Sequence, residues 1–299
     1  MVSVRADLTL NVEGLWLLQA LLGISSVAPE IRGLPYGPGV SDDWITEHPG
    51  AQALREAGIV DEKGQVAAEV RTQMQVLAAP DVEVAILCSP GALEWTVPLR
   101  LDDSSTWRAV PENQLRIVLA RKDDRWVSAA RVGDDITIDT VGSLPVEDLA
   151  DLVLTVMDSA HASEPATIAP LNLPLEDIAA AAAERGELPA GPRRARPLTD
   201  LGVKGAALAD LEAVLDDPQA EAVFYSRAYV DTEVRHSESV LNLRDTARGR
   251  VASYRTPPAV GSRQAWMTFV PATRSQVQHA VKAAVADLGL RSWERHTRM

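Results

Sequence analysis

The side chains that could carry out chemistry are few and scattered along this chain. Its five histidines are isolated, and none has a second histidine or a cysteine within four residues, as closely spaced metal ligands would require. The one cysteine, Cys88, lies in an apolar, strand-like run and is expected to be a buried hydrophobe rather than a reactive thiol. Neither a Gly-x-Ser-x-Gly elbow nor a phosphate-binding glycine-rich motif is present. The sequence therefore indicates no catalytic, cofactor-binding or metal-binding residue.

Three polar groups admit a functional and a structural interpretation. His236 is flanked by charged residues and is either a general base or, more simply, a solvated loop histidine. The aspartate pairs at 123–124 and 134–135 could be metal ligands, but aspartate also tolerates the dihedral angles of hairpin turns. Asp216 and Asp217 lie at the end of a predicted helix, where acids oppose the helix dipole, which hints at another duty such as a partner contact.

Composition and charge narrow the classes of function. The chain has 299 residues, is 46% hydrophobic and carries a net charge of -13, which is typical of a globular protein with an acidic surface. Such a surface repels phosphate, so neither nucleic acid nor anionic membrane is an expected partner. We find no secretion signal and no apolar run long enough to span a bilayer, so a cytoplasmic protein without membrane insertion is expected.

Apolar periodicity predicts alternating groups of helices and strands. Asn11 is expected to cap a helix that Gly23 ends, Ser143 to cap a second helix, and Thr273 to begin a capping box. Residues 187–197, rich in proline and arginine, are expected to be a solvated linker. Helices are predicted near 12–22, 49–57, 66–77, 143–156, 174–186, 206–216 and 274–288, and strands near 8–10, 82–86, 115–120, 126–132, 136–138, 221–230, 240–243, 250–254 and 266–270.

The two halves of the chain look like divergent copies of one unit. Residues 76–83 parallel residues 214–221, and the prolines that end the two helices, Pro80 and Pro218, are 138 positions apart. Each copy runs from helix through strand and hairpin to a capped helix. Two small sheets can join edge to edge with helices on their apolar faces. The predicted fold is α+β with a pseudo-two-fold internal repeat and a central, largely antiparallel mixed sheet flanked by helices, divided into half-repeats 1–160 and 161–299 of one continuous unit.

Several segments resemble, in order, those of one family. The match covers residues 8–296 and is similar to the EspG family of mycobacterial type VII (ESX) secretion. Three further segments look closest to the paralogue of the third ESX system: Ala28–Arg32, Asp43–Trp44 and Glu47–Gly50. The family resemblance itself is carried by Leu8–Gly23, with its Leu-Trp-x-Leu-Gln core, by Val76–Val84, by Gly249–Ala252 and by Phe269–Thr273.

The resemblance implies a cytosolic, substrate-specific chaperone rather than an enzyme. Such proteins bind PE–PPE heterodimers at the apolar tip of the PPE rod, keep them soluble and direct them to their ESX system. No cofactor is implied. The family's docking surface corresponds here to helix 206–216 and strands 221–244, and the loops at 31–45, 89–112 and 186–197 are expected to set partner choice. The partner-binding residues expected on this surface are Glu212, Phe224, Ser226 and Ser239.

Two other classes of function remain open from sequence. A small-ligand-binding or enzymatic α+β domain with a dispersed site would require a deep pocket lined by convergent polar groups. A self-assembling protein would use exposed sheet edges, and a weak homodimer is compatible with the chaperone as well. Trp95 and Trp107 lie in the long excursion and either anchor a partner or fix their own loop to the body.

Overall fold

The computed structural model describes residues 8–33, 48–97, 100, 102, 109–189, 191–216, 218–259 and 261–298. Trp44, Trp107, Asp217 and much of the loops 31–45 and 89–112 lie outside these ranges. The described elements are β1 (Leu8–Asn11), α1 (Val12–Leu22), η1 (Pro29–Ile31), α3 (Pro49–Glu56), α4 (Ala68–Ala78), β2 (Val82–Ser89), β3 (Leu115–Lys122), β4 (Arg125–Val132), β5 (Asp135–Val141), α5 (Val146–Ala160), β6 (Leu171–Pro174), α6 (Leu175–Glu187), η3 (Pro192–Ala195), α7 (Arg196–Asp200), α8 (Gly205–Leu215), β7 (Ala220–Val230), β8 (Glu233–His236), β9 (Leu241–Thr246), β10 (Gly249–Thr256), β11 (Trp266–Pro271) and α9 (Arg274–Ala286).

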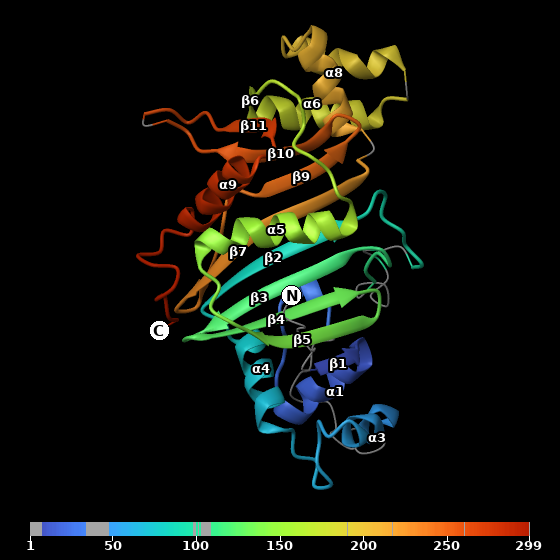
Figure 1. Ribbon diagram of the computed structural model, residues 1–299, viewed down its shortest axis with the longest axis vertical. Coiled ribbons are helices and arrows are strands. Elements are labelled where there is room, and N and C mark those ends of the chain that lie inside the picture. The colour runs from blue at the N-terminus through green and yellow to red at the C-terminus, as the bar shows by residue number, and fades with distance from the viewer. Residues whose placement is uncertain are drawn as a thin grey trace.

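One continuous antiparallel sheet runs through the whole molecule (Figure 1). The strand order is β1-β5-β4-β3-β2-β7-β9-β10-β11-β6, with β8 paired to the end of β7. The central pair is β2–β7, in register from Val82 opposite Ala228 to Ser89 opposite Glu221. The edge-to-edge joining of two half-sheets that the repeat predicted is therefore confirmed.

The strand order reads the same outward from the central pair in both directions. Each half contains an edge strand followed by a helix (β1–α1 and β6–α6), a helix leading into the central strand (α4–β2 and α8–β7), a hairpin, a further strand and a final helix (α5 and α9). The pseudo-two-fold α+β fold is confirmed. We propose that the half-repeats divide between α5 and β6, in keeping with the expected boundary after residue 160.

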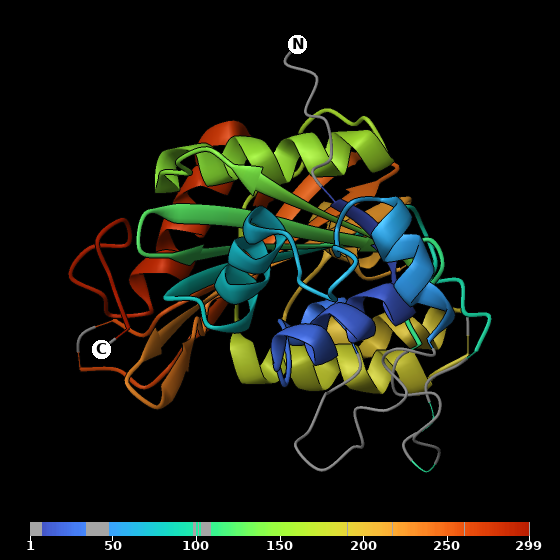
Figure 2. The same cartoon turned by 90° about the horizontal axis from the view of Figure 1, so that it is seen from below.

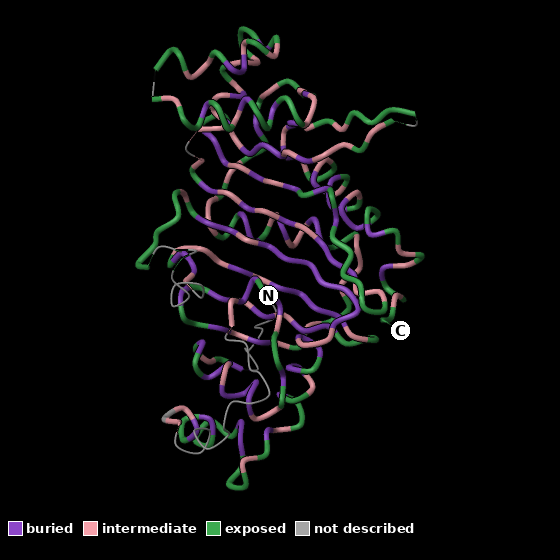
Figure 3. Tube along the Cα trace, turned by 180° about the vertical axis from the view of Figure 1, so that it is seen from behind, coloured by how far each residue is buried: buried purple, intermediate pink, exposed green. Residues whose placement is uncertain are grey.

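Helices cover the two faces of the sheet in different places. The apolar core beneath α5 and α9 contains Val84, Phe224 and Leu243, from the middle strands. On the opposite face, α1 and α4 cover the first-half end, with Ala120 and Ala129, and α6 to α8 cover the second-half end, with Val251. Figure 2 shows this layering edge-on, and Figure 3 shows burial concentrated along the central strands. Among the residues that the structure describes, no long helix covers the middle of the second face, over β2 and β7.

Local sequence explains the ends of some helices. The Asn11 side chain accepts from the Gly14 amide at 2.8 Å, and Gly23 closes α1 in the left-handed conformation (φ 65°), as predicted. The Thr273 hydroxyl likewise accepts from the Gln276 amide. The prediction for Ser143 was wrong, because α5 begins later, with Pro145 at its N-cap and no side-chain cap.

Other expectations need correction. Residues 171–174 form strand β6, whereas sequence periodicity assigned them only to the start of a helix. The expected linker 187–197 contains η3 and the start of α7. His236 lies in strand β8 and is exposed, and Trp266, expected in the core, is 38% exposed. Cys88 is 1% exposed, and burial raises the pKa of its thiol to about 11, which confirms a buried hydrophobe. No described helix has the length and apolar character needed to cross a bilayer.

Candidate functional site

A buried ion network lies at the seam between the two halves. Arg227 of β7 contacts Glu30 of η1 at 2.6 Å and Glu83 of β2 at 3.0 Å through its Nη2 atom. The hydroxyl of Tyr225 donates to Glu30 and that of Tyr229 donates to Glu83, each at 2.6 Å. These side chains lie on the face of the central strands that the long helices leave open. The network therefore forms part of the floor of that face and joins η1 to both central strands.

The two carboxylates that share this arginine have opposite pKa shifts. Burial raises the pKa of Glu83, and the charge of Arg227 only partly offsets it. Burial would also raise the pKa of Glu30, but the charge and hydrogen bond of Arg227 lower it on balance. Burial, together with the neighbouring Glu83 carboxylate, raises the pKa of Tyr229 as well. Each of these side chains has at least one intramolecular partner, although the Oε1 atom of Glu83 is buried without a hydrogen bond, so the arrangement stabilises the seam rather than presenting a reactive group.

Glu212 and Asp216 both belong to a second network that anchors α8. Arg185 of α6 has a side chain only 4% exposed and contacts Glu212 at 3.2 Å and Asp216 at 2.9 Å. It also donates to the Arg194 carbonyl at 2.6 Å, and Arg194 contacts Asp216 at 3.4 Å. The acid at the end of this helix therefore has an intramolecular role: it ties α6 and η3 to α8. This finding explains the unfavourable dipole position without a partner contact.

Three of the four expected partner-binding residues are buried. Phe224 is 0% exposed and packs in the core under α5 and α9, while Ser226 and Ser239 are each 1% exposed. The Ser226 hydroxyl donates to the Ala284 carbonyl at 2.9 Å, and the Ser239 amide donates to Asp287 at 2.7 Å. These three face α9, opposite to α8, so they support the sheet and are not surface contacts in this conformation. Glu212, whose side chain is 31% exposed, stays a candidate.

The equivalent helices α4 and α8 present different surfaces. In α4 the apolar side chains are buried: Val70 is 8%, Met74 0% and Leu77 2% exposed. In α8 the equivalent leucines, Leu208 and Leu215, remain half-buried. The outward positions differ too, because α4 carries Ala68, Arg71 and Gln75 where α8 carries Ala206, Ala209 and Ala213. The second-half helix thus has apolar side chains less covered by its own chain than the first-half helix does.

A small crevice beside α8 adds to this apolar surface. It is lined by α8 residues, by the segment before β6 and by Phe269 of β11. On the adjoining strands, Val223, Tyr225 and Asn242 are half-buried on the same face of the sheet as α8. Together, α8 and these strand positions form what we call the second-half face. A 3.6-residue period of alanines at 206, 209 and 213 is the sequence signal that could have identified it.

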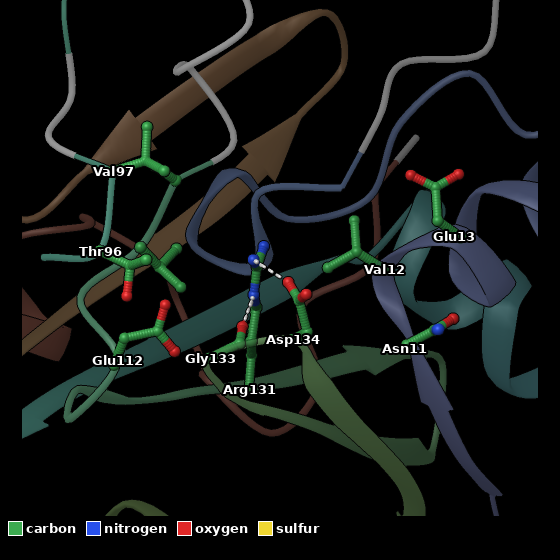
Figure 4. Close-up of a pocket in the computed structure, with 11 residues that line it drawn as sticks. Asn11, Val12, Glu13, Thr96, Val97, Glu112, Arg131, Gly133 and Asp134 are labelled. Atoms are coloured by element: carbon green, nitrogen blue, oxygen red, sulfur yellow. Dashed lines mark hydrogen bonds and ion pairs between the residues drawn. The ribbon is translucent and has the colours of Figure 1, made fainter.

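The hollow at the start of α1 is the strongest alternative for a small-molecule site (Figure 4). It has a volume of about 380 Å³ and is lined by the carboxylates Glu13, Glu112 and Asp134. Asp134 is 87% exposed, and the nearby Arg131 is occupied with backbone, because it donates to the carbonyls of Gly133 and Ile31, each at 2.7 Å. These groups do not form a set of nucleophile, base and orienting residue.

The acidic side chains at the hairpin turns were the other candidates, as metal ligands. Within the residues that the structure describes, no three histidine, cysteine, aspartate or glutamate side chains gather as metal ligands. The aspartates at 123 and 134 flank hairpin turns, and Asp123 has a positive φ of 55°, as a turn residue can. The geometry therefore favours these aspartates as turn residues rather than as metal ligands.

Comparisons with known proteins agree with this geometry. The model of the EspG family matches residues 11–283. ESX-5 secretion-associated protein EspG5 of Mycobacterium marinum is 41% identical over 297 residues, covering 99% of both chains. EspG5 of Mycobacterium tuberculosis is also 41% identical, over 300 residues and 99% of both chains, whereas ESX-1 secretion-associated protein EspG1 of that organism is 24% identical over 82% of this chain and 74% of its own. A solved structure, the type VII secretion system chaperone EspG5 in complex with a PE25-PPE41 dimer, superposes with a TM-score of 0.83 at 38% identity, covering 97% of this chain and 99% of that one.

Proposed function

This chain belongs to the EspG family, and we propose that it is a cytosolic chaperone of type VII secretion that binds PE–PPE heterodimers. Its end-to-end relatives are named for ESX-5 rather than for the third ESX system, so the expectation of a third-system paralogue is not supported. We therefore assign its clients to an ESX-5-type system. The EspG5 structure in complex with PE25-PPE41 supports this choice of client class.

The chaperone acts by covering apolar surface on its client. The tip of a PPE helical rod is apolar and, when exposed, promotes aggregation. A protein that shields this tip until secretion needs a complementary apolar surface, not a catalytic centre or a cofactor. Binding also identifies the client to its own secretion system, so we propose no enzymatic step.

The client docks on the second-half face. The observation that carries this proposal is the difference between α4 and α8: the first-half helix buries its apolar side chains, whereas Leu208 and Leu215 remain half-buried. Small alanines at the outward positions allow a partner helix to approach the α8 backbone closely. Glu212 lies at the margin of this surface and is the expected polar contact there.

A matched pair of variants tests the docking face. Ala206→Arg and Ala68→Arg introduce the same side chain at exposed, pseudo-symmetric positions near the starts of α8 and α4. Both should change the free energy of unfolding by less than about 0.5 kcal/mol, because neither position is buried. Binding of purified PE25-PPE41, measured by calorimetry, should weaken at least about tenfold, or about 1.4 kcal/mol, for Ala206→Arg alone.

The possible outcomes test the chaperone function and the position of the docking face separately. Equal affinity of both variants for the dimer would leave the chaperone function intact and move the docking face elsewhere. Weakening by Ala68→Arg alone would place it on the first half. If neither the wild type nor the variants bind PE25-PPE41 or any PE–PPE pair from the same organism, the proposed function is refuted.

A further inference from the structure

A basic pocket lies where the end of the chain packs beside β8. It has a volume of about 540 Å³, and its charged walls are Arg235 from β8 with Arg291 and Arg295 from the segment after α9. Asp231 is the acidic side chain that also lines it. In Figure 1 the C-terminal end lies beside the β3–β4 hairpin, far from α8. The pocket is therefore separate from the second-half face.

Its arginines are not neutralised by the chain itself. In the part of the chain that the structure describes, Arg291 and Arg295 belong to no ion pair, and Arg235 makes only a 3.5 Å contact with the Leu288 carbonyl. The chain as a whole carries a net charge of -13, so acidic groups are abundant. The three exposed guanidinium groups outnumber the one acidic side chain that lines the pocket, Asp231, so the pocket has a local excess of positive charge that an anionic partner can neutralise.

The wall that carries Arg291 and Arg295 is held rigidly in place. Arg121 donates to the carbonyls of Trp293 at 2.9 Å and His296 at 2.6 Å, on either side of Arg295. Trp293 is 4% exposed and packs against Trp126 with ring centroids 6.0 Å apart. The ring of His296 contacts the Tyr229 carbonyl at 2.8 Å. The backbone is thus fixed before any partner arrives, which lowers the entropy cost of binding.

The form of the pocket favours an extended chain over a compact polyanion. It lies beyond the C-terminal end of α9, where backbone carbonyls make the local potential negative, so a doubly charged phosphate is disfavoured more than singly charged carboxylates spread along a peptide. Strand β8, which supplies Arg235, pairs among the described strands with β7 only, and all four of its residues are exposed. A free strand edge can pair with an extended peptide.

We propose that this basic pocket binds an extended acidic segment of a partner protein, whose backbone runs along β8 and whose carboxylates pair with Arg235, Arg291 and Arg295. Arginine is suited to this role because its planar guanidinium pairs with carboxylate in a bidentate geometry. Because the pocket is remote from α8, such a partner can bind while a client occupies the second-half face.

The test uses the full chain and a defined probe. A fluorescein-labelled peptide of alternating glutamate and serine is titrated at low salt, and its anisotropy is compared with that of the same peptide carrying glutamine. The double variant Arg291→Glu/Arg295→Glu should weaken binding of the acidic peptide at least about tenfold, as loss of close charge pairs does. The control Arg55→Glu/Arg71→Glu makes the same charge change at exposed arginines elsewhere and should leave affinity within about twofold.

Several results would overturn the proposal. They are a lack of saturable binding of the acidic peptide to wild type, equal binding of the glutamine peptide, or equal weakening by the control. Pyrophosphate that binds while the peptide does not would show a phosphate site instead. Ala206→Arg should leave binding of the acidic peptide unchanged. The proposal for the basic pocket can therefore fail without the proposal for client docking failing, and the reverse.

Discussion

Hairpins β3–β4 and β9–β10 occupy equivalent places in the two halves, yet each holds a neighbouring segment with a different arrangement of charge. The backbone is equivalent: the Asp81 amide donates to the Arg121 carbonyl at 2.7 Å, and the Gln219 amide donates to the Asp245 carbonyl at 2.8 Å. The side chains at these positions are not equivalent, because the first hairpin has Arg121 where the second has Asp245. Arg121 is opposite Trp126, whereas Asp245 is opposite Arg250.

Both hairpins nevertheless hold the end of a final helix from the other half. Arg250 donates to the His161 carbonyl at 2.7 Å and contacts Asp158 at 2.6 Å, and so fixes the end of α5. Arg121 fixes the segment after α9 through the carbonyls of Trp293 and His296. The two halves therefore share the backbone pairing and an arginine that holds the neighbouring segment, but the arginine stands at different positions of the two hairpins.

Among the predictions, replacing each of these two arginines should have the largest effect on the free energy of unfolding. Arg250→Leu leaves Asp245, which is 0% exposed, without its main counter-charge, so it should lower the free energy of unfolding by about 3–5 kcal/mol. Arg121→Leu should cost less, about 1–3 kcal/mol, because Asp81 still accepts from the amides of Asp123 and Arg298. Urea unfolding of both variants measures the difference.

A local readout and a matched control accompany that measurement. Trypsin should cut near the C-terminal end faster in Arg121→Leu and not in Arg250→Leu, since only Arg121 holds that segment. Arg125→Leu, at an exposed position of the same hairpin, should stay within about 0.5 kcal/mol of wild type. A greater loss for Arg121→Leu than for Arg250→Leu would contradict the proposed roles.

The seam between the halves offers a smaller, pH-dependent effect. Glu30→Gln should lower the free energy of unfolding by about 1.5–3 kcal/mol at pH 7, because it removes a charge-assisted hydrogen bond. Glu83→Gln should cost less, since burial raises the pKa of Glu83 and opposes its ionised form. The pKa of Glu30 is lowered on folding, so its contribution is present above the usual glutamate pKa of about 4.3 and is lost as pH falls through the folded-state pKa.

Urea unfolding of wild type, Glu30→Gln and Glu83→Gln across pH 7 to 3 checks this prediction. The curves of wild type and Glu30→Gln should converge at the acid end. Curves that stay parallel would show that ionisation of Glu30 does not account for the loss.

The sequence predicted the scaffold better than the candidate site. Pro80 and Pro218, the Asn11 cap and the Thr273 cap are local signals that do not depend on distant contacts, so the repeat and the capped helices could be predicted. Strand β6 could not, because its four residues become a strand only by pairing with β11. Tertiary pairing of this kind outweighs local propensity.

The sequence could not decide which face of a strand is covered by helices. Alternation in β7 separates Phe224 and Ser226 from Tyr225 and Arg227, but it does not tell which set lies under α5 and α9. The structure packs the first set under α5 and α9 and turns the second set to the opposite face, where Tyr225 is half-buried and Arg227 is buried in the ion network of the seam. Likewise, nothing local to Arg185 indicates that it pairs with Glu212 and Asp216 of a later helix.

The most direct test of the central claim is co-expression of this chain with PE–PPE pairs from its own organism, followed by size-exclusion chromatography with light scattering. We expect a 1:1:1 complex with at least one ESX-5-type pair, lost with Ala206→Arg and retained with Ala68→Arg. A folded chain that elutes alone with every pair, or that forms only homo-oligomers, would contradict the chaperone function.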